Sequence, residues 1–125
     1  MHYTNQAKDL FNPGTDLTAA ASAPVAGKTF VTISGAPTRG LFQVATATPG
    51  TTALGVAKYD AATGDLVGIA RGHRIITVTA GEALPAGTTV QVGTNGQAVA
   101  LTDGTPVGIT VDTAAAGTDC YIALR

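Results

Sequence analysis

Turn dipeptides that contain glycine divide this chain into many short apolar runs, and that spacing limits it to folds built from short β-strands. Between residues 74 and 124 the runs are separated by Ala80-Gly81, Ala86-Gly87, Asn95-Gly96 and Asp103-Gly104. Asn-Gly and Asp-Gly favour two-residue hairpin turns, because both central residues of such a turn need a positive φ. This half of the sequence therefore predicts consecutive antiparallel hairpins.

An alternation of residue types near the C-terminus predicts which side of one strand faces the core. Successive side chains of a strand point to opposite faces, so residues two apart share a face. We expect one apolar set to pack in the core and the residues between its members to face water. The apolar set is Val107, Ile109 and Val111, and the intervening residues are Gly108, Thr110 and Asp112.

The segment 54–70 is similar in sequence to the segment 107–123. Both place a glycine at the start of a strand, a pair of alanines in the following loop and a second glycine after that pair. The two glycines have one spacing in both segments: Gly55 and Gly64 in the first, Gly108 and Gly117 in the second. Two interpretations stay open: an internal structural duplication, or two similar hairpins that each close with an alanine-rich loop.

From Lys28 onward, turn residues recur at intervals of about 8 to 12 residues, the spacing of a barrel or a sandwich. The expected strands are KTFVTIS from Lys28, LFQVATA from Leu41, residues 54–59, 66–70 and 73–79, and four more near Thr88, Gln97, Pro106 and Cys120. No long amphipathic helix is predicted. We therefore predict an all-β fold, a small single-domain β-barrel or β-sandwich-like structure of the β-tulip type with about nine short strands.

The first 27 residues show neither the strand nor the helix period, and Pro13-Gly14 and Pro24 would interrupt a helix. We expect an extended N-terminal arm over residues 1–27 and a β-domain over residues 28–125. The arm carries a few large apolar side chains among polar ones, suited either to docking on another surface or to packing on the arm's own domain. These candidate contact residues are Tyr3, Leu10 and Phe11.

The composition indicates a thin core and excludes several classes of partner. Hydrophobic residues make up 45% of the chain, but aromatic residues only 5% and charged residues 12%, with a net charge of −1. A core of small side chains fits a sheet closed on itself or additional burial between subunits.

Nucleic-acid binding needs clustered Lys and Arg, which are absent from the sequence. No apolar run approaches the roughly 20 residues of a membrane helix, and Ala21-Ser22-Ala23 lacks the flanking regions of a secretion signal.

Residues that could carry catalysis are few. His73 lies between Arg71 and Arg74, and the sequence places neither a nucleophile nor an orienting carboxylate beside it. Cys120 alternates with Ile122 and Leu124, which predicts a small buried hydrophobe rather than a nucleophile. We expect no catalytic activity and no small-molecule substrate.

The remaining polar motifs fit turns better than ligand sites. Two histidines, His2 and His73, make a poor metal site. Asp60 and Asp65 lack the ligand spacing of an EF-hand loop, and the Gly35–Gly40 segment lacks the Lys-Ser/Thr ending of a phosphate loop. No cofactor and no metal are expected, and the sequence is best interpreted as a binding or structural module.

The last half of the chain resembles a known family. ITVTAGEALPAGTTVQVGTNGQAVALTDGTPVGITVDTAAAGTDCYIALR, residues 76–125, resembles the C-terminal part of the capsid decoration proteins of tailed phages, also called cement or head-stabilising proteins. The segment 55–70 resembles the family's first copy of a Gly-Val-Ala strand. The match departs from the family pattern at Thr110 and Cys120, and it hardly extends to the arm.

The resemblance implies a structural virion protein without catalytic activity. It would be made in the host cytoplasm and would bind the outer surface of an assembled phage capsid as a homotrimer, bridging subunits of the major capsid protein. The arm would then contact the capsid through Tyr3, Leu10 and Phe11. Two alternatives remain: a phage fibre or receptor-binding β-domain, and a small hydrolase that uses His73 with an aspartate.

Overall fold

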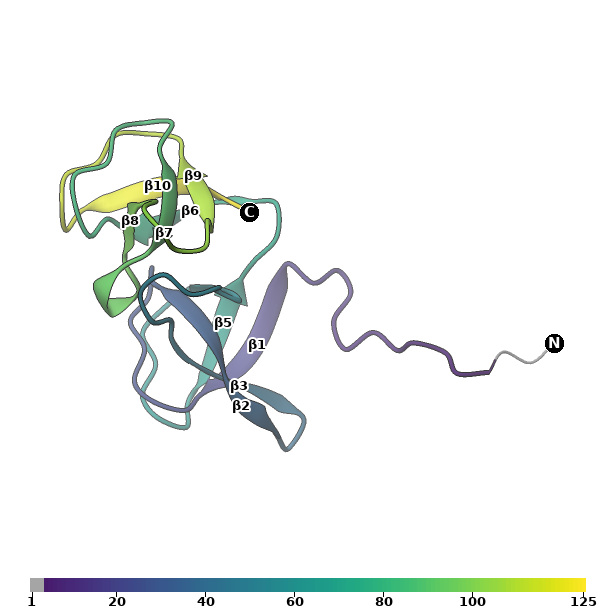
Figure 1. The fold of residues 1–125 in the computed structure, drawn as a ribbon. Coiled ribbons are helices and arrows are strands. Elements are labelled where there is room, and N and C mark those ends of the chain that lie inside the picture. The colour runs from purple at the N-terminus through teal and green to yellow at the C-terminus, as the bar shows by residue number, and fades with distance from the viewer. Residues whose placement is uncertain (1–3) are drawn as a thin grey trace.

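The computed structural model describes residues 4–125, and these residues form an all-β fold, as predicted (Figure 1). All nine expected strands are present, and a tenth precedes them. The strands are β1 (Asp16–Ala21), β2 (Phe30–Thr38), β3 (Leu41–Thr46), β4 (Gly55–Ala57), β5 (Leu66–Ala70), β6 (Ile75–Thr79), β7 (Thr89–Val92), β8 (Ala98–Ala100), β9 (Gly108–Thr110) and β10 (Asp119–Leu124). A 3-10 turn, η1 (Thr94–Gly96), lies between β7 and β8.

The first five strands form a closed barrel in the order β1-β3-β2-β4-β5. Strand β1 pairs with β5 in antiparallel orientation and with β3 in parallel orientation. It therefore joins the two ends of the sheet and completes the barrel. The interior is filled by small and branched apolar side chains: Leu17, Ala19, Ala21, Val25, Val31, Val44, Ala57, Ala61, Val67 and Ile69. We call this unit the N-terminal barrel.

Strand β1 corrects the expected boundary of the arm at residue 27. Leu17, Ala19 and Ala21 are almost fully buried in the barrel interior, and Val25 pairs with Ala61 beyond the end of the strand. Residues 16–27 therefore belong to the folded barrel, and the arm ends at Thr15. The sequence DLTAAA has little strand propensity of its own, so pairing with two neighbouring strands determines this conformation.

The last five strands form a second sheet in the order β6-β10-β9-β7-β8. Its two edge strands approach each other through one parallel bridge between Ala80 and Ala98, where Gly81 N donates a hydrogen bond to Ala98 O at 2.7 Å. This bridge stands where β1 pairs with β3 in the first unit. The sheet is thus a less completely closed version of the same barrel, and we call it the C-terminal barrel.

The two barrels are an internal structural duplication, one of the two interpretations that the sequence left open. The strand pairings correspond one by one, from β1–β5 with β6–β10 to β2–β3 with β7–β8. The loop bridges correspond too, since Val25 pairs with Ala61 in one barrel and Leu84 with Ala114 in the other. The similarity of segments 54–70 and 107–123 therefore reflects a repeat that covers both halves of the chain.

The set of residues predicted to face the core around β9 was Val107, Ile109 and Val111, and the prediction is wrong for two of the three. Ile109 and Val111 are 43% and 47% exposed, whereas Thr110 is 2% exposed. The Thr110 hydroxyl donates a hydrogen bond to Pro85 O and accepts one from Thr88 N, so this polar side chain is buried with its hydrogen bonds satisfied. Val107, which lies just before β9, is buried in the core of the C-terminal barrel, as expected.

Phe30 joins the two barrels. It belongs to β2 of the N-terminal barrel, yet its side chain, 1% exposed, packs in the core of the C-terminal barrel with Val56 and Ala47. Backbone hydrogen bonds reinforce the junction, including Thr79 N to Lys28 O at 2.9 Å and Gly50 N to Val92 O at 2.8 Å. Figure 1 shows the C-terminal barrel above the N-terminal barrel, with the arm leading away from the start of β1.

Two equivalent glycines provide a test of the duplication. A Cβ on Gly55 would lie 2.3 Å from Ala70 O and 2.9 Å from Ile69 Cγ2, and one on Gly108 would lie 2.7 Å from both Ala123 O and Ile122 Cγ2. Because backbone blocks both sites, we expect Gly55→Ala and Gly108→Ala each to lower the free energy of unfolding by about 1–3 kcal/mol. Urea denaturation measures both.

Gly35→Ala is the matched control, since no heavy atom lies within 4 Å of its added Cβ. Its stability should change by less than about 0.5 kcal/mol, as for surface positions in general. Parent-like stability of Gly108→Ala would contradict the close approach of β9 and β10.

Candidate functional site

The first candidate site is the arm, residues 4–15, which contains no strand and is mostly exposed. Leu10 is 65% exposed and Phe11 is 38% exposed. The Phe11 ring lies 5.5 Å from that of Phe42, between centroids, in a tilted arrangement. In this conformation Phe11 packs on its own barrel, while Leu10 offers a large apolar side chain to solvent. Tyr3, the third residue predicted for this site, lies outside the described residues.

The root of the arm is fixed by a cluster of charged side chains, two from the N-terminal barrel and one from Arg74, which directly precedes β6. Asp16 Oδ1 accepts hydrogen bonds from Lys58 Nζ and from Arg74 Nη1, the latter at 2.8 Å. Arg74 Nη1 also donates to Thr15 O at 2.9 Å, and Arg71 N donates to the same oxygen at 3.0 Å. The hydrogen bond from Lys58, followed by that from Arg74, lowers the pKa of the Asp16 carboxyl below its ordinary value. The arm therefore leaves the barrel from a defined point.

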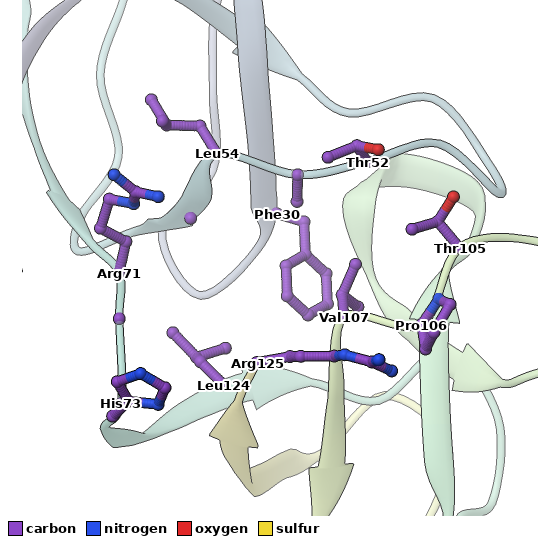
Figure 2. Close-up of a pocket in the computed structure, with 13 residues that line it drawn as sticks. Phe30, Thr52, Leu54, Arg71, His73, Thr105, Pro106, Val107, Leu124 and Arg125 are labelled. Carbon is purple, nitrogen blue, oxygen red and sulfur yellow. The ribbon is translucent and has the colours of Figure 1, made fainter.

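A pocket of about 350 Å³ lies between the two barrels. Its floor is apolar, and Figure 2 shows the Phe30 ring beside Val107 and close to Leu124. The rim carries three basic side chains and no acidic residue: Arg71, His73 and Arg125. Such a pocket suits an anionic group with an apolar body, but it holds no nucleophile beside a base.

His73, the residue on which a hydrolase would depend, is exposed on this rim. None of the residues that line the pocket with it is an aspartate or a glutamate that could orient its ring. Across residues 4–125, no group of three or more His, Cys, Asp or Glu side chains is placed to hold a metal ion.

Cys120 is fully buried, as its alternation with Ile122 and Leu124 predicted. Burial raises the pKa of its thiol to about 11, and the hydrogen bond to Asp112, 3.2 Å between Sγ and Oδ1, contributes to the same shift. The thiol stays protonated at neutral pH, and a protonated buried thiol is a poor nucleophile.

Helices long and apolar enough to cross a membrane are absent from the part of the chain that the structure describes.

The described residues thus form two similar barrels with a projecting arm. The family of phage cement proteins matches the chain over residues 11–125. The chain belongs to this family, and it is a structural protein associated with a phage capsid. A search of the curated proteins finds no match.

A solved structure has the same fold. The N base of the head fibre protein gp8.5 of bacteriophage phi29 matches with a TM-score of 0.76 and 24% sequence identity, over 88% of this chain and 92% of that one. At this level of identity the likeness concerns the fold.

The sequence named Leu10 and Phe11 but missed the charged cluster at the root of the arm. Asp16, Lys58 and Arg74 come from three distant segments, and only the closure of the barrel by β1 brings them together. Because residues 16–21 were assigned to the arm, no feature of the sequence placed Asp16 beside a basic residue. The inter-barrel pocket was missed for a different reason. Its floor depends on Phe30, a residue of β2 whose side chain packs in the core of the other barrel.

The charged cluster gives a prediction about pH. We expect Asp16 to titrate below the ordinary value of 3.8, and Lys58→Met to bring its pKa closer to that value because the largest cause of the shift is removed. A carboxyl with a lowered pKa stabilises the fold above the unfolded pKa, and this contribution is lost as the pH falls through the folded pKa. Carboxyl-detected NMR titration follows Asp16 directly.

Lys28→Met is the matched control, since Lys28 pairs with Asp119 and not with Asp16. It should leave the midpoint of Asp16 unchanged. An Asp16 midpoint that is unchanged by Lys58→Met would contradict the assigned cause.

Proposed function

We propose that this protein binds the outer surface of an assembled phage capsid as a homotrimer and stabilises the shell by bridging neighbouring subunits of the major capsid protein. Membership of the cement family supports attachment to a capsid. The observation that carries the proposal is the arm, a projecting segment with an exposed Leu10 and a half-exposed Phe11 on a fixed root. The arm therefore combines an exposed apolar side chain with a fixed attachment point, as a docking segment requires.

The energetics of docking indicate how such an arm binds. Ordering a backbone costs about 1–2 kcal/mol per residue, which for about a dozen residues is on the order of 10–20 kcal/mol. Full burial of an exposed side chain such as Leu10 contributes only about 1.5–3 kcal/mol, and Phe11, which is 38% exposed, contributes less. Apolar anchors therefore offset the ordering of a few residues, and the rest of the arm must gain backbone hydrogen bonds, as when a strand adds to the edge of a capsid sheet.

Stabilisation of the shell follows from linkage. A protein that binds the assembled lattice but not the free subunits shifts the equilibrium toward assembly by RT ln(1 + [L]/Kd) for each site. Each bridge between two capsid subunits must also break before the lattice opens. Many copies with modest affinity therefore suffice to strengthen a shell under internal pressure.

Self-association is the second part of the proposal. The core contains few large side chains, and the chain carries only 12% charged residues, so burial between copies would add to a limited apolar core. We expect sedimentation equilibrium to give a trimer at micromolar concentration, and a monomer in solution would contradict a stable trimer.

A second candidate function is the base of a head fibre. It is favoured by the likeness of the fold to the phi29 head fibre N base, and it also places the chain on a phage head. Thermal opening of shells distinguishes the two functions. A cement protein raises the temperature at which empty shells open, whereas a fibre base decorates them without this effect.

Deletion of residues 1–14 tests the arm. The cut lies before β1, so the melting temperature of the barrels should stay within about 2 °C of the parent, in line with the small effects expected outside the packed core. Co-sedimentation with empty shells should fall at least tenfold. A longer deletion to residue 26 is unsuitable, because it removes β1 and opens the N-terminal barrel.

Point variants identify the anchors. Leu10→Ala and Phe11→Ala should each weaken shell binding by about 5- to 50-fold, since interface hot spots cost at least 1–2 kcal/mol. Lys8→Ala, an exposed residue of the same arm, is the matched control and should bind like the parent. If the truncated chain decorates shells at parent occupancy, the arm is not the anchor.

A further inference from the structure

The outer face of the C-terminal barrel carries a cluster of exposed apolar side chains. Ile75 on β6 and Ile109 on β9 both pair with Ala123 of β10, so the three residues form one row across three strands. Tyr121 lies in the next row, where its carbonyl oxygen accepts a hydrogen bond from Val111 N. Ile75, Ile109, Val111 and Tyr121 are 60%, 43%, 47% and 52% exposed. We call these four residues, with Ala123, the outer patch.

The duplication supplies an internal comparison for this patch, because each position has a counterpart in the N-terminal barrel. Asp16 pairs with Ala70 as Ile75 pairs with Ala123. Lys58 N donates to Gly68 O as Val111 N donates to Tyr121 O. The counterparts of Ile75, Val111 and Tyr121 are thus an aspartate, a lysine and a glycine. Apolar side chains at these places are therefore not a requirement of the barrel itself.

The remaining counterparts show what covers such a face. Val56 corresponds to Ile109, because each pairs with the equivalent alanine, Ala70 or Ala123. Val56 and Ala70 are completely buried, and Val56 packs into the core cluster of the C-terminal barrel. This face of the N-terminal barrel is therefore covered by a barrel of the same fold, whereas Ile109 is left uncovered.

We propose that a second copy of this chain packs on the outer patch. The proposal rests on the self-association proposed above and names the surface that carries it. The contact within the chain shows that a barrel of this fold can cover such a face, and the patch itself contains no charged side chain. Exposed apolar clusters of this kind mark protein interfaces, and tyrosine is enriched in them.

A contact between copies that resembles the contact between the two barrels would also be compatible with a closed ring of copies. Within the chain the two barrels meet through different surfaces, so the contact is heterologous. Each chain offers the outer patch once. A heterologous contact of this kind, repeated between copies, generates a closed ring when its rotation allows. The patch includes no residue of the arm, so capsid docking by the arm and association through the patch use different residues.

The test replaces one patch residue by a charge. Ile109→Asp should lower the association of the free protein at least 100-fold, so that sedimentation equilibrium gives a monomer at concentrations where the parent is trimeric. The far-UV circular dichroism should be unchanged, because Ile109 points to solvent in the single chain. Ile33→Asp is the matched control, an isoleucine that is 50% exposed on the N-terminal barrel outside the patch, and it should associate like the parent.

Tyr121→Ser is a second variant with a smaller perturbation, and it keeps the test decisive if Ile109→Asp fails to fold. Its association should weaken at least tenfold. Parent-like association of both folded variants overturns the proposal, as does a monomeric parent. If the patch variants associate normally but lose shell binding, the patch contacts the capsid instead, and the proposed cement function stands without this inference.

Discussion

Burial of one aromatic ring between the two barrels is the contact on which the rest of the structure depends. Phe30 is the only one of the three phenylalanines that is fully buried. Its backbone belongs to β2 of the N-terminal barrel, and its side chain packs in the core of the C-terminal barrel. Removing a buried Phe side chain typically costs 3–5 kcal/mol, a large share of the 5–15 kcal/mol that stabilises a domain of this size. This shared core holds the two barrels, and with them the arm root and the outer patch, in a fixed relation.

The duplication explains how a chain with few large side chains builds a stable fold. A single five-stranded barrel filled mainly by alanine and valine buries little apolar surface, and small domains are marginal for this reason. Two such barrels cover one another, so that Val56 and Phe30, which would lie on the outside of an isolated barrel, add to a shared core. Once the unit is duplicated, the exposed counterparts can diverge. The first copy carries Asp16 and Lys58, which form the charged cluster with Arg74, and the second carries the apolar residues Ile75 and Val111 at the counterpart positions.

The sequence was sufficient for the class of fold and for all the strands after Lys28, because hairpin turns and short apolar runs are local signals. It was insufficient for β1, since DLTAAA becomes a strand only through pairing with β3 and β5, which are distant in sequence. The inward face of β9 was misassigned because a buried threonine with satisfied hydrogen bonds follows no hydrophobic pattern. Of the candidate site, the anchors Leu10 and Phe11 were visible as isolated large residues. The charged root and the outer patch were not, because each exists only where separate strands meet.

The proposed arrangement also accounts for the plain sequence of the arm. A trimer presents three arms at fixed separations, and docking of the first raises the effective concentration of the other two to roughly the millimolar range for short tethers. Each arm can then bind weakly on its own while the trimer binds tightly. The gain is lost when the three sites are not held at the matching spacing, so free capsid subunits are bound poorly and the assembled lattice is bound well. Selectivity for the assembled shell thus follows from the geometry of self-association rather than from specific contacts in the arm.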